Sequence, residues 1–252
     1  MTRANLFDMP QANGIQPFPE PPYYSQNREY FIVSYETDIE LLKAIVPQPL
    51  EVTSNIVKYE FIRMPSYGLG DFTESGQVIP VSYQGEAGGY IHTMVLDGPT
   101  SIAAGRDIWG FPKRNAEPKL YIDNTDALVG TLDYGTIRIA QATMGLKHRK
   151  VPLEAVQQAV TQATFVVKNL PGVDGRPQIC ELNKFYLGDV TVHEAWTGPA
   201  TLELFQHALV PMAALPVRKV VSALHFRVDV TVDYGTTVVD YLTAEKNAEA
   251  GK

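Results

Sequence analysis

The sequence predicts a mainly β protein of the α+β class, built as a single β-rich domain with a few peripheral helices. Runs of β-branched and aromatic residues recur between Gly, Pro and Asp residues, which is typical of strands and turns. Only two segments have helical spacing, and strands and helices do not alternate regularly, which counts against a doubly wound sheet. A length of 252 residues suits one β-rich domain. This pattern fits a closed barrel and packed sheets equally well.

The chain divides into an arm, a main domain and a tail. Residues 1–26 are expected to form an extended arm, because four prolines lie between residues 17 and 22 and disfavour a helix. The main domain is expected over residues 27–242. Residues 243–252 are small and charged, so we expect this tail to fray.

The first half of the domain begins with a strand and a short helix. The aromatic and β-branched run Tyr30–Tyr35 predicts a strand. Thr37 or Asp38 can cap a helix over Ile39–Ile45, which the following prolines end. Further strands are predicted over Ile56–Met64, Val78–Tyr83, Gly89–Leu96, Lys119–Asp123, Ala127–Tyr134 and Thr136–Thr143.

The second half contains the other predicted helix. Over Pro152–Ala163, apolar residues recur at helical spacing, and Pro152 suits a first helical turn. The rest of the domain returns to strand-like composition. These later strands are predicted over Thr164–Leu170, Pro177–Lys184, Tyr186–Thr197, Thr201–Phe205 and Val217–Asp233.

Charge and cysteine content narrow the function. A net charge of −7 argues against a nucleic-acid partner, which needs a basic face. Cys180 is the only cysteine, so an intramolecular disulfide and a cysteine zinc site are excluded. The N-terminus does not resemble a signal peptide, and no apolar run is long enough for a membrane span. We therefore expect a cytoplasmic protein that does not bind membranes.

Common cofactor signatures are also missing from the sequence. No glycine-rich dinucleotide or phosphate-binding motif lies between a strand and a helix. The histidines are scattered without metal-ligand spacing, so neither a metal nor another cofactor is expected. They are His92, His148, His193, His207 and His225.

The most informative segment for chemistry is Gly105–Arg114. A lysine acts as a nucleophile only when its amine is deprotonated, and burial or a neighbouring cation lowers its pKa. Bringing a lysine pKa from about 10.4 to near neutrality takes roughly 4–5 kcal/mol. Trp109 and Phe111 supply an apolar setting for Lys113, and Arg114 supplies the cation. By spacing alone, however, a Lys-Arg pair is more often found on a solvated loop.

A set of blocks spread over the chain resembles the acetoacetate decarboxylase family. Each block is weak alone, but they occur in the family's order from about Pro19 to Tyr241. This family is itself a standard example of lysine activation, so the resemblance and the interpretation of Lys113 are not independent. The blocks are Asn27–Phe31, Phe72–Gln77, Gly105–Lys113, Thr131–Gly135, Ala142–Gly145, Ile179–Leu182 and Asp189–Pro199.

The resemblance implies a role for each matching residue. Lys113 matches the lysine that forms a Schiff base with the substrate ketone, and Arg28 matches the arginine that orients the carboxylate of a β-keto acid. Glu74, ranked first, and Glu60 match acidic positions that move a proton or orient the imine. The resemblance also implies a closed, cone-like barrel.

Other implied features concern the pocket and the partners. Phe111 and Trp109 are expected to line the substrate pocket. Arg114 departs from the family's pattern, which has a second lysine there, but it keeps the cation. The family implies a large homo-oligomer, with a dodecamer as one arrangement.

Three functions remain open from the sequence. The first is a cofactor-independent decarboxylase that converts acetoacetate, or a close β-keto acid, to a ketone and CO2. The second is a related aldolase-dehydratase or cyclase-dehydratase that forms the imine without losing CO2. The third is a non-catalytic β-barrel that binds a small carboxylate through Arg28. The joint presence of Lys113, Arg28 and Glu74 favours the decarboxylase.

Overall fold

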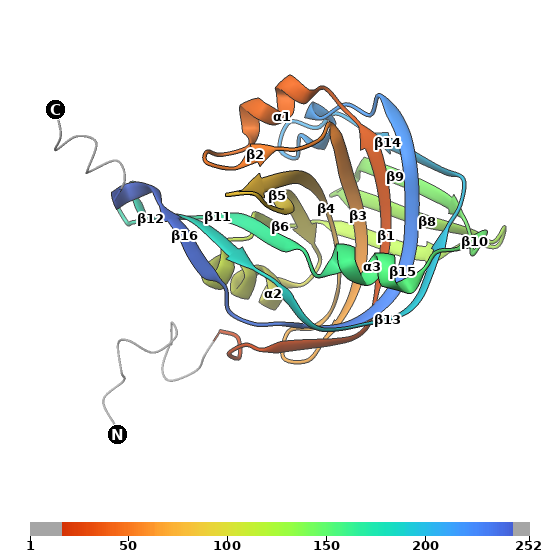
Figure 1. The fold of residues 1–252 in the computed structure, drawn as a ribbon, viewed down its shortest axis with the longest axis horizontal. Helices are drawn as coiled ribbons and strands as arrows, with labels where there is room; N and C mark the ends of the chain where they lie inside the picture. Colours follow the sequence, from red (N-terminus) through yellow and green to blue (C-terminus); the bar gives the residue numbers. More distant parts are fainter. Residues whose placement is uncertain (1–16, 244–252) are drawn as a thin grey trace.

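The computed structural model describes residues 17–243 as two layers of β-sheet with helices at the margins (Figure 1). The predictions for residues 1–16 and 244–252 lie outside the described residues. No helix in the part of the chain that is described is long and apolar enough to span a bilayer.

The larger layer is a strongly curved sheet of twelve strands. Its main path is β10 (Arg149–Lys150), β13 (Leu187–Thr197), β15 (Lys219–Val232), β1 (Tyr23–Glu36), β3 (Ile56–Ser66), β4 (Gly70–Tyr83), β5 (Glu86–Leu96), β11 (Ala163–Pro171), β12 (Pro177–Phe185) and β16 (Thr236–Asp240). Off this path, β2 (Glu51–Val52) pairs with β4 and β6 (Lys113–Asn115) pairs with β5.

The smaller layer has four antiparallel strands and packs on one face of the larger sheet. Its order is β14 (Ala200–Leu204), β9 (Ile137–Gly145), β8 (Ala127–Tyr134) and β7 (Glu117–Ile122). The helices are α1 (Ile39–Ile45), α2 (Pro99–Ala104), a π-helix (Gly105–Trp109), α3 (Leu153–Val160) and a 3-10 turn (Met212–Ala214).

The predicted closed barrel is not confirmed. The path of the larger sheet has two ends, and neither sheet closes on itself within residues 17–243. Strand β10 has two residues, and among the described strands it pairs only with β13, while β16 pairs only with β12. A barrel needs its first and last strands to pair with each other. The strand-rich single domain itself is as predicted.

The two faces of the larger sheet have different surroundings, because successive side chains of a strand point to opposite faces. In β1, Phe31, Val33 and Tyr35 are fully buried and form the main core with residues of the smaller sheet. The alternate residues, Arg28 and Tyr30, face a cavity on the other side. In β3, β4 and β15 the same alternation directs alternate side chains into the cavity, so these strands also form its floor.

Candidate active site

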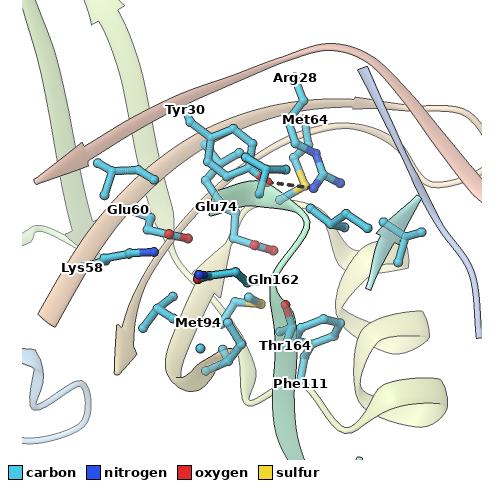
Figure 2. Close-up of a pocket in the computed structure, with 18 of the residues that line it drawn as sticks. Arg28, Tyr30, Lys58, Glu60, Met64, Glu74, Met94, Phe111, Gln162 and Thr164 are labelled. Carbon is cyan, nitrogen blue, oxygen red and sulfur yellow. Dashed lines mark hydrogen bonds between the residues drawn. The ribbon is translucent and has the colours of Figure 1, made fainter. Parts of the chain in front are cut away.

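A cavity of about 300 Å³ lies on the face of the larger sheet opposite the smaller one. Its floor comes from β15, β1, β3 and β4, and helix α3 and strand β11 form part of its walls. Figure 2 shows Glu60 and Glu74 pointing into the same space, with Thr164 of β11 and Gln162, which precedes this strand, across from them. The lining is mainly apolar, with a few ionisable side chains, as is usual for a small-molecule site.

Strand register sets the positions of the polar groups on the floor. Glu74 of β4 pairs with Ile62 of β3, and Ile62 pairs with Tyr30 of β1. Glu60 and Lys58 follow on β3 at two-residue steps, so each lies about 7 Å further along the strand. The floor therefore carries Glu74, Glu60 and Lys58 in successive rows.

A short helical connection delivers Lys113 to this floor. Helix α2 continues into the π-helix, which ends at Gly110 with a left-handed φ of 91°. Gly110 and Phe111 both donate backbone hydrogen bonds to the carbonyl of Gly105, which closes the turn before Lys113. Strand β6 then pairs Lys113 alongside Met94 of β5.

Lys113 is buried and its amine has specific partners. Only 7% of the residue is exposed. Its Nζ lies 3.2 Å from Oε2 of Glu74, which is itself 2% exposed, and donates a hydrogen bond of 2.9 Å to Oγ of Ser101. The rings of Phe72 and Phe111 lie 5.4 and 5.2 Å from Nζ.

The surroundings lower the pKa of Lys113 below its ordinary value. Burial is the main cause, because it disfavours the charged ammonium. Glu74 opposes this change, and the positive charge of Arg28 adds to it. The net direction favours a neutral amine, which is the form that attacks a carbonyl.

Arg28 is a buried cation without a carboxylate partner among the described residues. It is 6% exposed, and it donates hydrogen bonds to the hydroxyls of Tyr30 (3.0 Å) and Ser25 (3.4 Å). Its Nε is buried without a hydrogen-bond partner. A guanidinium in this state is ready to receive a carboxylate from a ligand.

Glu60 differs from Glu74 in its environment. It lines the cavity, and burial raises its pKa to about 7. Lys58 opposes this rise, while Glu74 adds to it. Glu60 is therefore able to hold or release a proton near neutral pH.

The structure places the remaining predicted site residues in two groups. Phe111 and Trp109 both line the cavity, and Trp109 also donates a hydrogen bond from Nε1 to the carbonyl of Asp233. Arg114 lies outside the cavity, is exposed, and donates a 2.6 Å hydrogen bond to the carbonyl of Leu209. Adjacent strand residues point to opposite faces, so Arg114 cannot share the setting of Lys113. Arg28 supplies the nearby cation instead.

Sequence reasoning missed three polar residues of the site. Tyr30 was expected only as part of a strand, although its hydroxyl holds Arg28. Lys58 has the two-residue spacing from Glu60 that places both on one face of a strand, so alternation alone signals it. Ser101 had no signal, because helix α2 was not predicted.

This arrangement suits chemistry at a carbonyl carbon. It combines an amine with a lowered pKa, a carboxylate beside that amine, a second carboxyl that titrates near neutrality, and an uncompensated guanidinium. Among the described residues, no group of three or more His, Cys, Asp and Glu side chains is placed to hold a metal ion.

Comparisons with known proteins identify the family. The family model described as acetoacetate decarboxylase matches residues 8–242. Acetoacetate decarboxylase 1 of Bradyrhizobium diazoefficiens is 53% identical over 241 residues, covering 95% of both chains. Acetoacetate decarboxylase of Paraburkholderia xenovorans is 53% identical over 240 residues, covering 95% of this chain and 94% of the relative.

Solved structures extend the comparison to the fold. The crystal structure of acetoacetate decarboxylase from Legionella pneumophila has a TM-score of 0.91 and 51% identity, and the match covers 94% of each chain. The enduracididine biosynthesis enzyme MppR, in complex with pyruvate, has a TM-score of 0.77 at 17% identity, with 88% of this chain and 92% of MppR covered, so it shares the fold alone. The full-length match at about half identity and the matching fold show that the chain belongs to the acetoacetate decarboxylase family.

Proposed function

We propose that the protein decarboxylates acetoacetate to acetone and CO2 through a Schiff base on Lys113. The observation that carries this proposal is the buried amine of Lys113, whose pKa is lowered and whose Nζ lies 3.2 Å from Glu74 in an apolar cavity. Family membership and the acetoacetate decarboxylases at about half identity support the same substrate.

The chemistry follows from the neutral amine. Nζ attacks the ketone carbon to give a carbinolamine, which loses water and becomes a protonated imine. The bond between the α-carbon and the carboxylate then breaks, its electron pair moves toward the imine nitrogen, and CO2 leaves an enamine. Protonation of the enamine carbon and hydrolysis of the new imine release acetone and the free lysine.

Three further side chains take part in the reaction. Arg28 binds the substrate carboxylate, which compensates its buried charge. Glu74 stays beside Nζ and stabilises the cationic imine. Glu60, with a pKa of about 7, supplies the proton to the enamine carbon. Phe111 and Trp109 contribute apolar walls.

Borohydride reduction with acetoacetate tests the nucleophile. Sodium borohydride reduces the imine to a stable secondary amine, which peptide mass spectrometry then locates, while released CO2 is measured in parallel. We expect a single adduct at Lys113, together with CO2. Lys58 is the internal control, because it is the other lysine that lines the cavity.

Three outcomes would contradict this proposal. An adduct at Lys58 would reassign the nucleophile. An adduct at Lys113 without CO2 would favour the dehydratase chemistry of more distant relatives. No adduct would leave Lys113 without its assigned role, and only a carboxylate-binding function through Arg28 would then remain.

We also propose that the protein is a cytoplasmic homo-oligomer. Family membership supports the oligomer, as do exposed apolar side chains such as Tyr67 (66% exposed) and Leu209 (60%). The single cysteine supports a reducing compartment. Light scattering after size-exclusion chromatography tests the oligomer, because a mass of 27.9 kDa would identify a monomer.

A further inference from the structure

Ser101 is a fully buried hydroxyl in direct contact with the nucleophile. It lies in helix α2, is 0% exposed and lines the cavity. Its Oγ accepts the 2.9 Å hydrogen bond from Nζ of Lys113. None of the residue roles proposed above uses this contact.

The hydrogen bond to Ser101 matters because a neutral amine has only two hydrogens to donate. A neutral lysine amine has two N–H bonds and one lone pair, arranged tetrahedrally around nitrogen. Ser101 Oγ lies 2.9 Å from Nζ and accepts one N–H, while Oε2 of Glu74 lies 3.2 Å from Nζ as a charge contact without hydrogen-bond geometry. With one N–H fixed by Ser101 and the carboxylate of Glu74 close to Nζ, the directions open to the lone pair are restricted, and it is left for the substrate carbonyl.

The backbone around Lys113 keeps the amine between these two groups. A Cβ on Gly105 would lie 2.6 Å from Cδ and 2.7 Å from Cε of Lys113, so only glycine leaves room for the lysine side chain. Ser101 precedes Gly105 by one helical turn. Helix α2 therefore provides the acceptor at the end of the lysine side chain, and the first residue of the π-helix that continues it provides the space.

We propose that Ser101 is a positioning residue, whose hydroxyl accepts one N–H of Lys113 and directs the lone pair of Nζ toward the substrate carbonyl. This inference rests on the proposed Schiff-base function. Once the imine forms, its nitrogen keeps one N–H, which the carboxylate of Glu74 holds more strongly than a hydroxyl does. Ser101 therefore acts before and during attack rather than in the later loss of CO2.

The inference predicts two effects of Ser101→Ala. Loss of the acceptor leaves the amine less well directed, so the rate of imine formation should fall about tenfold. The hydroxyl also stabilises the ammonium form, so its loss lowers the pKa of Lys113 further. The acid limb of the kcat/KM profile should therefore move to lower pH while the plateau falls.

Ser75→Ala is the matched control. Ser75 is also fully buried and donates a 3.1 Å hydrogen bond to the hydroxyl of Tyr59, but it lies on the core side of β4. Its loss should reduce stability without moving the pH profile. Ser101→Cys is a second test variant, because the thiol is nearly the same size and a much weaker acceptor.

The experiment follows the borohydride-trapped Lys113 adduct over time with acetoacetate and measures kcat/KM from pH 5 to 9. Slower trapping and an acid-shifted profile in Ser101→Ala and Ser101→Cys, with Ser75→Ala like the wild type, support the inference. Wild-type trapping rates and an unchanged profile in the folded Ser101 variants overturn it. Absence of any Lys113 adduct in the wild type would instead overturn the Schiff-base function itself.

Discussion

At the scale of single residues, the sequence did not predict which cation lies near Lys113. Arg114 is adjacent in the chain, and proximity in sequence made it the predicted neighbour. The alternation of strand β6 sends it to the exposed side, where it binds the carbonyl of Leu209. Arg28 is 85 positions away from Lys113 in the chain, and only strand pairing brings its charge close enough to lower the pKa of Lys113.

This difference predicts opposite behaviour for two arginine substitutions. Arg28→Gln removes a charge that lowers the pKa of Lys113, so the pKa should rise and imine formation should need a higher pH. Arg114→Gln should leave that pH dependence unchanged. Borohydride trapping with acetone measures the effect cleanly, because acetone has no carboxylate for Arg28 to bind. A shift of the pH dependence in Arg114→Gln, with none in Arg28→Gln, would mean that Arg114 is the cation that lowers the pKa of Lys113.

Glu60 gives a second prediction, which concerns stability. Because burial raises its folded pKa from 4.5 to about 7, folding favours the protonated carboxyl. This contribution is fully present below pH 4.5 and is lost as the pH rises through 7. Glu60→Gln should therefore leave the unfolding free energy similar at low pH and raise it by about 3 kcal/mol at pH 8.

Thermal or urea unfolding at pH 4.5 and pH 8 measures this difference. Glu203→Gln is the control, because Glu203 is exposed on β14. The same variant should show reduced turnover, since Gln cannot supply the enamine proton. Equal stabilisation at both pH values would mean that the carboxyl of Glu60 is not the cause.

At the scale of elements, the sequence predicted regular segments well and missed those that build the site. Helix α1 has the predicted bounds, because its polar start and following prolines mark both ends. Strand β4 begins at Gly70 instead of Val78, since its first half carries polar residues and glycine where the cavity needs Glu74 and close packing. Strand β1 likewise begins at Tyr23, within the predicted arm. In these segments, polar residues and glycine stand where strand prediction expects alternating apolar residues.

The helical connection before Lys113 was missed for a related reason. Helix α2 and the π-helix are too short for a periodic pattern, and α2 is rich in small residues. The chemistry of the Gly105–Arg114 segment was predicted, but its shape was not. π-Helices are uncommon and occur often at functional sites.

Two glycines in this connection should respond differently to substitution. In Gly105→Ala, the three atoms nearest to the new Cβ all belong to the flexible side chain of Lys113, so the protein should fold with a small loss of stability while imine formation falls strongly. In Gly110→Ala, φ is 91° and Cβ would lie 2.3 Å from Cα of Lys168, so folding itself should suffer by several kcal/mol. Unfolding curves and borohydride trapping separate the two effects. Equal loss of stability in both variants would contradict this assignment.

At the scale of the whole molecule, the sequence predicted the strand content but not whether the sheet closes into a barrel. Alternation in each strand identifies a buried face, but it does not say which strands pair. The parallel pairing of β11 with β5, for example, joins segments more than 70 residues apart and leaves β16 at the end of the path. A barrel and an open, curved sheet both satisfy the same local pattern.

The open path makes a prediction for hydrogen exchange. Strands β1 and β3 pair on both sides and bury Phe31, Val33, Tyr59 and Phe61 completely, so their amides should open only with global unfolding. Strand β16 pairs on one side, and its residues are half-buried or exposed. Its amides should exchange at least about a hundredfold faster, which corresponds to roughly 3 kcal/mol less local stability.

Exchange measured by mass spectrometry on the native assembly also tests what covers this edge. If β16 proves as protected as β3, its outer edge is covered in solution, and pairing with a second copy is the simplest cover. Dilution distinguishes this case, because protection supplied by another subunit falls when the measured mass falls toward 27.9 kDa. Protection that persists in the monomer would instead mean that the chain closes its own sheet, and the open path described above would be wrong.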